Sequence, residues 1–113
     1  MQATGFSAPP PVRDILGRIG GTSMVPLRRV APPGSARVLL KLESENPTGS
    51  MKDRMALAMV EAAEADGRLA PGAPVVEYTG GSTGVSLALV CAVKGHPLHV
   101  VSSDAFAPAK LEH

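Results

Sequence analysis

One lysine in this chain lies where a strand-like pattern gives way to a helical one. Residues 38–43 alternate in the way that predicts a β-strand, and a helix is predicted from Lys52 onward. Residues 46–49, Asn-Pro-Thr-Gly, are typical of a turn. In the first turn of a helix, exposed N–H groups disfavour an ammonium. The neutral amine favoured there can attack a carbonyl and form a Schiff base. The alternative is a solvated lysine that the helix tolerates.

The predicted helix has start and end signals of its own. Ser50 and Asp53 have the spacing of a capping box, with aspartate in place of the usual glutamate. Gly67 is placed to end the helix in a left-handed conformation. The apolar residues at near-helical spacing are Met55, Met59 and Ala62.

A second segment with chemical potential is Thr-Gly-Gly-Ser-Thr-Gly, residues 79–84. It lies between a predicted buried strand, 74–78, and an apolar helix, 85–93. Glycine allows close approach of a ligand, and the helix start supplies N–H donors, so the segment suits a carboxylate or phosphate. The alternative is a tight turn without a ligand. The segment lacks both the lysine-containing ending of a P-loop and the dinucleotide-binding spacing, which counts against a nucleotide site.

The order of elements predicts an α/β fold. Strands at 38–43, 74–78 and 98–102 alternate with helices, which indicates a parallel sheet with right-handed crossovers. The loops at Ser50 and Ser82 would then open at the same edge of that sheet. We interpret residues 1–12 as a flexible proline-rich arm that precedes this α/β region.

Composition narrows the class of protein. The 113 residues are 44% hydrophobic and 19% charged, with a net charge of +1, which is typical of a globular chain with a modest core. The absence of a basic run and the 3% aromatic content argue against nucleic-acid and membrane partners. No segment of the sequence has the layout of a secretory signal or a membrane span.

The cysteine and histidines offer little chemistry. The single cysteine, Cys91, cannot form an internal disulfide, which fits a cytoplasmic protein, and we expect it to be buried in a helix. The single tyrosine, Tyr78, is expected to pack at a strand end. No metal site is predicted, because His96, His99 and His113 lack metal-ligand spacing.

Three stretches resemble the cofactor-lysine segment of the cysteine synthase and cystathionine β-synthase family of pyridoxal-phosphate enzymes. They are Lys41-Leu42-Glu43, Asn46-Pro47-Thr48-Gly49-Ser50 and Lys52-Asp53-Arg54. The resemblance extends from about Arg13 to the end of the chain, and it implies that residues 13–113 are the incomplete N-terminal part of a pyridoxal-phosphate dependent α/β catalytic region. It implies a parallel three-layer α/β sheet, the N-terminal part of a fold type II (tryptophan synthase β-like) enzyme.

The resemblance also implies residue roles. Lys52 would bind pyridoxal 5′-phosphate covalently and later act as general base on the substrate α-proton. The family's loop for the substrate carboxylate and the cofactor ring hydroxyl matches residues 79–84 here. Gly80 replaces a serine of the family pattern, and Ser82 replaces its asparagine. The implied substrate-binding residues are Thr79, Gly80, Gly81, Ser82 and Thr83, with Ser82 also near the cofactor.

The implied activity is β-replacement on an O-activated serine by a sulfur nucleophile, in a homodimer. Cystathionine β-synthase and serine or threonine dehydratase are alternatives, and a non-catalytic fragment or small anion-binding module is an alternative of another class. Family enzymes are several times longer than this chain. Leu111, Glu112 and His113 are either the start of a histidine tag or part of a native helix over 109–112.

Overall fold

A computed structural model describes residue 8 and residues 10–105 of the chain. Most of the predicted proline-rich arm lies outside the described residues. The predicted helix over 109–112, and the possible tag at 111–113, lie outside them as well.

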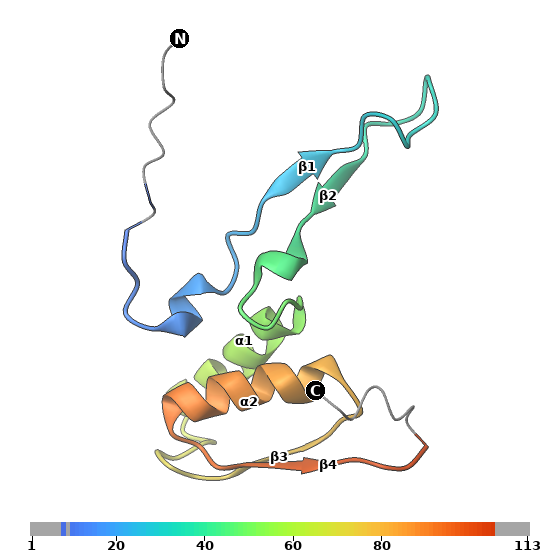
Figure 1. Cartoon of the computed structure of the whole chain (residues 1–113). Coiled ribbons are helices and arrows are strands. Elements are labelled where there is room, and N and C mark those ends of the chain that lie inside the picture. Colours follow the sequence, from blue (N-terminus) through green and yellow to red (C-terminus); the bar gives the residue numbers. More distant parts are fainter. Residues whose placement is uncertain (1–7, 9, 106–113) are drawn as a thin grey trace.

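The body of the molecule is a β–α–β unit with a second helix packed on it. β3 (Val75–Tyr78) and β4 (Leu98–Val101) pair in parallel, and α2 (Ser82–Lys94) connects them. α2 lies over one face of this pair, and α1 (Lys52–Ala65) packs against α2 (Figure 1). The predicted α/β class with parallel pairing is therefore confirmed.

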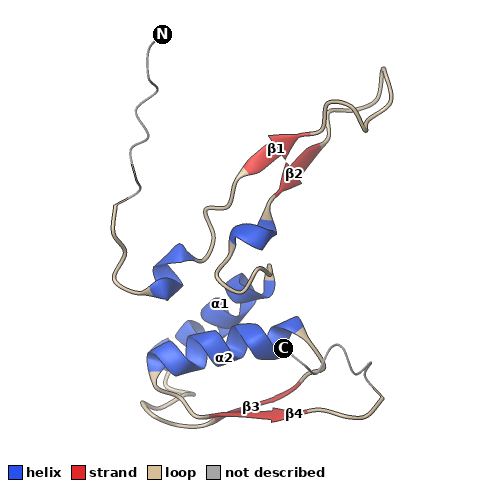
Figure 2. Ribbon diagram, viewed as in Figure 1, coloured by secondary structure: helices blue, strands red, loops and turns tan. Residues whose placement is uncertain are grey.

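A second, separate ribbon projects from this body (Figure 2). Its strands, β1 (Met24–Pro26) and β2 (Leu39–Lys41), pair antiparallel. A 3-10 helix, η1 (Ile15–Arg18), precedes the ribbon, and another, η2 (Glu43–Glu45), follows it. The prediction that 38–43 joins the parallel sheet is wrong, because the backbone of this strand takes its partners from β1 rather than from β3 or β4.

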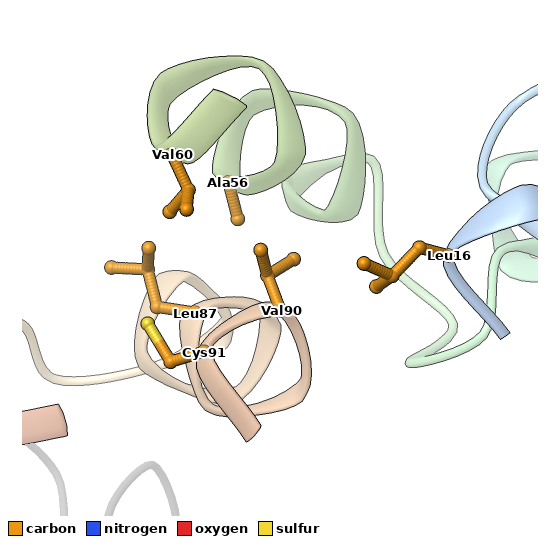
Figure 3. Close-up of a cluster of buried hydrophobic side chains, with 6 residues drawn as sticks. All are labelled: Leu16, Ala56, Val60, Leu87, Val90 and Cys91. Carbon is orange, nitrogen blue, oxygen red and sulfur yellow. The ribbon is translucent and has the colours of Figure 1, made fainter. Parts of the chain in front are cut away.

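The hydrophobic core is small and lies between the two helices. Ala56 and Val60 of α1 point toward Leu87 and Val90 of α2, and Leu16 of η1 approaches from one end (Figure 3). Burying a side chain of this size stabilises the fold by about 1.5–3 kcal/mol. The core therefore fixes how α1 and α2 pack against each other.

The apolar spacing of Met55, Met59 and Ala62 does not mark the buried face of α1, and the expectation that Tyr78 packs at a strand end is wrong. Met55, Met59 and Ala62 are exposed, because α1 turns the face of Ala56 and Val60 inward instead. Tyr78 is 60% exposed, because alternation along β3 points it away from α2.

Other local predictions are confirmed. Gly67 follows α1 with φ +80°, the left-handed conformation expected of it. Cys91 is buried in α2, where burial, followed by the nearby Glu64 carboxylate, raises the pKa of its thiol. Among the described residues, no helix is both long and apolar enough to cross a bilayer.

Candidate functional site

The turn that precedes Lys52 is held by a buried asparagine. The side-chain oxygen of Asn46 accepts the Gly20 N–H at 2.9 Å, and its amide group donates to the Glu43 carbonyl at 3.0 Å. Lys52 is the first residue of α1 and is half-buried. Its backbone N–H donates to Ser50 Oγ at 3.1 Å. The predicted position of Lys52, at the start of a helix, is confirmed.

The predicted capping box between Ser50 and Asp53 is wrong. Asp53 points into the protein with no exposed surface, and its carboxylate accepts the Thr48 N–H at 2.8 Å. It also accepts the hydroxyl of Thr48 and, at 2.6 Å, the hydroxyl of Ser86 in α2. The carboxylate thus reaches the turn and the neighbouring helix instead of capping its own helix at Ser50.

This contact joins the starts of the two helices. Asp53 is the second residue of α1, and Ser86 is one turn into α2. At the other ends, Lys94 of α2 contacts Glu64 of α1 at 2.8 Å. The helices therefore run in the same direction, with both N-termini on one side (Figure 1). The two loops were expected to share a sheet edge, but the helix pairing is what places their helix starts together.

The 79–84 segment is compact and leaves the start of α2 without a side-chain cap. The Thr79 N–H donates to the Val101 carbonyl at 2.9 Å, and Thr79 Oγ1 accepts the Gly81 N–H at 3.3 Å. A Cβ on Gly84 would lie 2.6 Å from the methyl group of Thr79, so only glycine fits without a shift. Gly80, Gly81 and Thr83 are half-buried, and Ser82 is exposed. The Gly84 N–H donates to the Gly81 carbonyl at 3.0 Å, and the start of a helix offers its remaining backbone N–H groups to an anion.

A charged clamp, formed by Glu43, Arg54 and Thr22, supports the lysine turn. Arg54 donates to the Glu43 carboxylate through Nε at 2.8 Å and Nη2 at 2.9 Å. Thr22 donates to the same carboxylate at 2.9 Å. These bonds, that of Arg54 first, lower the pKa of Glu43 to about 2. In the sequence, Glu43 and Arg54 stood out only as part of the stretches that resemble the family. Their pairing could not be predicted, because they lie on different elements.

A second polar cluster joins the far ends of the helices. Buried His96 contacts Glu64 Oε1 through Nε2 at 2.8 Å and the Ala73 carbonyl through Nδ1 at 2.9 Å. Two acceptors facing the ring favour its charged form, so the hydrogen bond to Glu64, then that to Ala73, raises the pKa of His96. Bonds from Lys94, then His96, lower the pKa of Glu64. Sequence reasoning considered His96 only as a metal ligand. In the part of the chain described, no group of three or more His, Cys, Asp or Glu side chains is arranged to hold a metal ion.

Comparisons with known proteins agree with one another. Residues 15–113 match the family model described as pyridoxal-phosphate dependent enzyme. Over 86 residues, which are 76% of its length, this chain is 54% identical to a cysteine synthase of Staphylococcus aureus and 44% identical to cysteine synthase B of Escherichia coli. The chain spans only 28% of the length of these relatives.

Solved structures are similar over nearly the whole chain. O-ureido-L-serine synthase matches with a TM-score of 0.82 and 44% identity, covering 89% of this chain and 32% of that one. O-acetyl serine sulfhydrylase isoform 3 from Entamoeba histolytica matches with a TM-score of 0.82 and 34% identity, covering 96% of this chain and 34% of that one.

Proposed function

Because this chain belongs to the pyridoxal-phosphate dependent enzyme family, we propose that it is the N-terminal part of a cysteine synthase. The reaction is replacement of the β-substituent of an O-activated serine by a sulfur nucleophile, which yields cysteine. Relatives named as cysteine synthases and a structural neighbour named as an O-acetyl serine sulfhydrylase support this substrate class. By analogy with the family, we also propose that the protein is a homodimer. Its single free cysteine supports a location in the cytoplasm.

The described residues fit pyridoxal phosphate. Lys52 is a half-buried residue at a helix start, and its side chain ends in a primary amine, the group needed to hold an aldehyde covalently. Gly84 has no space for a side chain because Thr79 packs against it, so this glycine sets the compact path of the backbone over residues 79–84. The uncapped start of α2 adds N–H donors for an anionic group.

Each residue then has a role in the proposed reaction. Lys52 would hold the cofactor through its amine and would also act as general base on the substrate α-proton. The segment formed by Thr79, Gly80, Gly81, Ser82 and Thr83 binds the substrate carboxylate, through its hydroxyls and through backbone N–H groups other than those of Thr79 and Gly81, which already donate within the protein. The Ser82 hydroxyl would also help to hold the cofactor, since it has one hydrogen bond to donate. Pyridoxal phosphate, when bound, supplies an electron sink for the charge that develops at the α-carbon.

The observation that carries this proposal is the pairing of the two helix starts. The Asp53–Ser86 hydrogen bond, at 2.6 Å, places the Lys52 turn and the segment 79–84 at the same end of the α1–α2 pair. A substrate amino acid presents an amine and a carboxylate a few bonds apart, so a reactive lysine and an anion site at one end suit it.

The test uses the full-length protein that contains this chain. We expect borohydride reduction to leave a pyridoxyl adduct that peptide mapping assigns to Lys52, and O-acetylserine with sulfide to give cysteine. Lys52→Ala removes both the adduct and the activity, whereas Lys94→Arg, at the far end of the helices, keeps both. An adduct on another lysine, or none, contradicts the proposal.

A further inference from the structure

Asp53 is a buried carboxylate on the apolar face of a helix. It shares the inward face of α1 with Ala56 and Val60, and it has no exposed surface. No ion pair of the described residues includes it, and its carboxylate accepts hydrogen bonds from hydroxyl and amide groups. Burying a carboxylate without a cation opposes folding unless hydrogen bonds satisfy it. Stability alone would be served as well by an apolar side chain of similar size.

The donors to this carboxylate come from two segments that the proposed chemistry needs. Thr48, in the turn before Lys52, donates its N–H at 2.8 Å and also its hydroxyl. Ser86, in α2, donates its hydroxyl at 2.6 Å. The hydroxyls of Thr48 and Ser86 are themselves 3.3 Å apart, which closes a triangle around the carboxylate. Each hydroxyl gives its one proton to Asp53, so the two sides that meet at the carboxylate are directional hydrogen bonds, unlike the apolar packing beside them.

Short, stiff stretches of backbone connect the triangle to both proposed binding groups. Lys52 directly precedes Asp53 within α1. Ser82, the first residue of α2, lies one helical turn before Ser86. A shift of Asp53 relative to Ser86 therefore becomes a shift of Lys52 relative to the 79–84 segment.

We propose that Asp53 is a positioning residue that fixes the distance between Lys52 and the carboxylate-binding segment 79–84. This inference rests on the proposed function, in which the amine of the substrate amino acid binds near Lys52 and its carboxylate binds at the segment 79–84. Asp53 touches neither ligand group; it acts through Thr48 on one side and Ser86 on the other. A ligand that uses both places depends on this distance, and a ligand that uses only the cofactor end does not.

The experiment compares two ligands in the full-length protein loaded with pyridoxal phosphate. L-serine carries both the amine and the carboxylate, and 2-aminoethanol lacks the carboxylate. Both are titrated against the visible absorbance of the cofactor in wild type, Asp53→Asn and Ser86→Ala. Asp66→Asn is the matched control, because Asp66 is an exposed aspartate just after the same helix.

We expect Asp53→Asn and Ser86→Ala each to raise the Kd for L-serine about tenfold, in the range of coupling between contacting residues. The Kd for 2-aminoethanol stays within about twofold, a difference under 0.5 kcal/mol. Asp53→Asn replaces one acceptor oxygen by an NH2 group, and the double variant is no weaker than Asp53→Asn alone, because both changes act on the same contact between Asp53 and Ser86. A merely structural role lowers thermal stability and leaves the ratio of the two Kd values unchanged.

Each outcome decides a separate question. An equal loss for both ligands, or a Kd for L-serine that matches the Asp66→Asn control, overturns the positioning role while the adduct at Lys52 upholds the proposed function. A wild-type protein with no adduct at Lys52 overturns both. If Asp53→Asn does not fold, Ser86→Ala, which removes only a hydroxyl, gives the deciding ratio.

Discussion

The two ends of the α1–α2 pair are joined by polar clusters of opposite character. At the N-terminal end, the Asp53 carboxylate is held by an amide N–H and two hydroxyls from Thr48 and Ser86. At the C-terminal end, the Glu64 carboxylate is held by Lys94 and His96. Each cluster joins residues at least 30 positions apart in the sequence: Asp53 to Ser86 in the first, and Glu64 to Lys94 and His96 in the second. Only the second cluster contains cations.

Helix dipoles give a physical reason for this difference. Parallel helices place two partial positive charges side by side at their starts and two partial negative charges at their ends. A carboxylate is therefore favoured between the starts, and Lys94 and His96 are favoured at the end of α2. The start also remains open to a further anion, which the proposed function requires.

The comparison also separates chemistry from pH sensitivity. The donors to Asp53 do not titrate near neutral pH, so the end that holds Lys52 keeps its geometry there. At the other end the pKa of His96 is raised, first by its hydrogen bond to Glu64, and loosening that contact changes stability without touching the proposed site.

The largest expected effect is on the N-terminal cluster. Asp53→Ala leaves the Ser86 hydroxyl and two Thr48 donors without their acceptor, so we expect the free energy of unfolding to fall by about 3 kcal/mol. Urea unfolding of the full-length protein measures this change, with Asp66→Ala as an exposed control that stays near wild type. A loss for Asp53→Ala no greater than for the control would show that the buried carboxylate does not hold the helices together.

The next effect compares a glycine at each end of α2. The methyl group of Gly84→Ala would lie 2.6 Å from Thr79 Cγ2, and such overpacking costs about 1–3 kcal/mol. Thr79→Ser removes that methyl group, so the double variant regains most of the lost stability. Gly95→Ala is strained for another reason, its φ of +79°, and has no neighbour within 4 Å to relieve it. Thermal unfolding of all four variants checks the pattern, and a Gly84→Ala variant that Thr79→Ser does not rescue contradicts it.

A smaller effect is the pH dependence of the C-terminal cluster. The pKa of His96 is raised above 6.5, so its stabilising contribution is complete below 6.5 and is lost as pH rises through the folded-state value. The pKa of Glu64 is lowered below 4.5, so its contribution is present above 4.5 and is lost as pH falls through the folded-state value. We expect the difference in thermal midpoint between wild type and His96→Gln to be widest between 4.5 and 6.5 and to narrow toward alkaline pH.

The N-terminal cluster provides the control for this titration. The difference between wild type and Ser86→Ala should stay constant from pH 6 to about pH 9, because hydroxyl and amide donors do not titrate there. A His96→Gln difference that is equally constant would mean that the ring does not gain charge in the folded protein.

The smallest effect is local to the clamp of Glu43, Arg54 and Thr22. The pKa of Glu43, at about 2, means that its contribution is present above 4.5 and is lost only as pH falls toward 2. Arg54→Gln removes the main cause, so NMR titration of the Glu43 carboxyl should show its pKa rising toward 4.5. An unchanged titration curve in Arg54→Gln would assign the low value to Thr22 and Asn46 instead.

The sequence by itself determined the local features of the site. Turn residues before Lys52, glycines before Ser82 and the change from strand to helical spacing are local signals, and each predicted a helix start that the structure has. The family resemblance, carried by the segment around Lys52, is confirmed by the match over residues 15–113. The roles of Lys52 and of residues 79–84 stay predictions.

Only the tertiary structure decided what the polar residues between these signals do. Asp53 has the spacing of a capping residue and also, with Ala56 and Val60, the spacing of a buried face; the second pattern was the signal that could have identified it. Its partner Ser86 lies 33 residues away, and Glu64 lies 32 residues from His96. The antiparallel pairing of β2 with β1 is likewise a contact between distant segments. Local propensity limits each backbone segment to a helix, strand or turn, but which buried hydrogen-bonding groups meet is set by how the helices pack, and that depends on the whole chain at once.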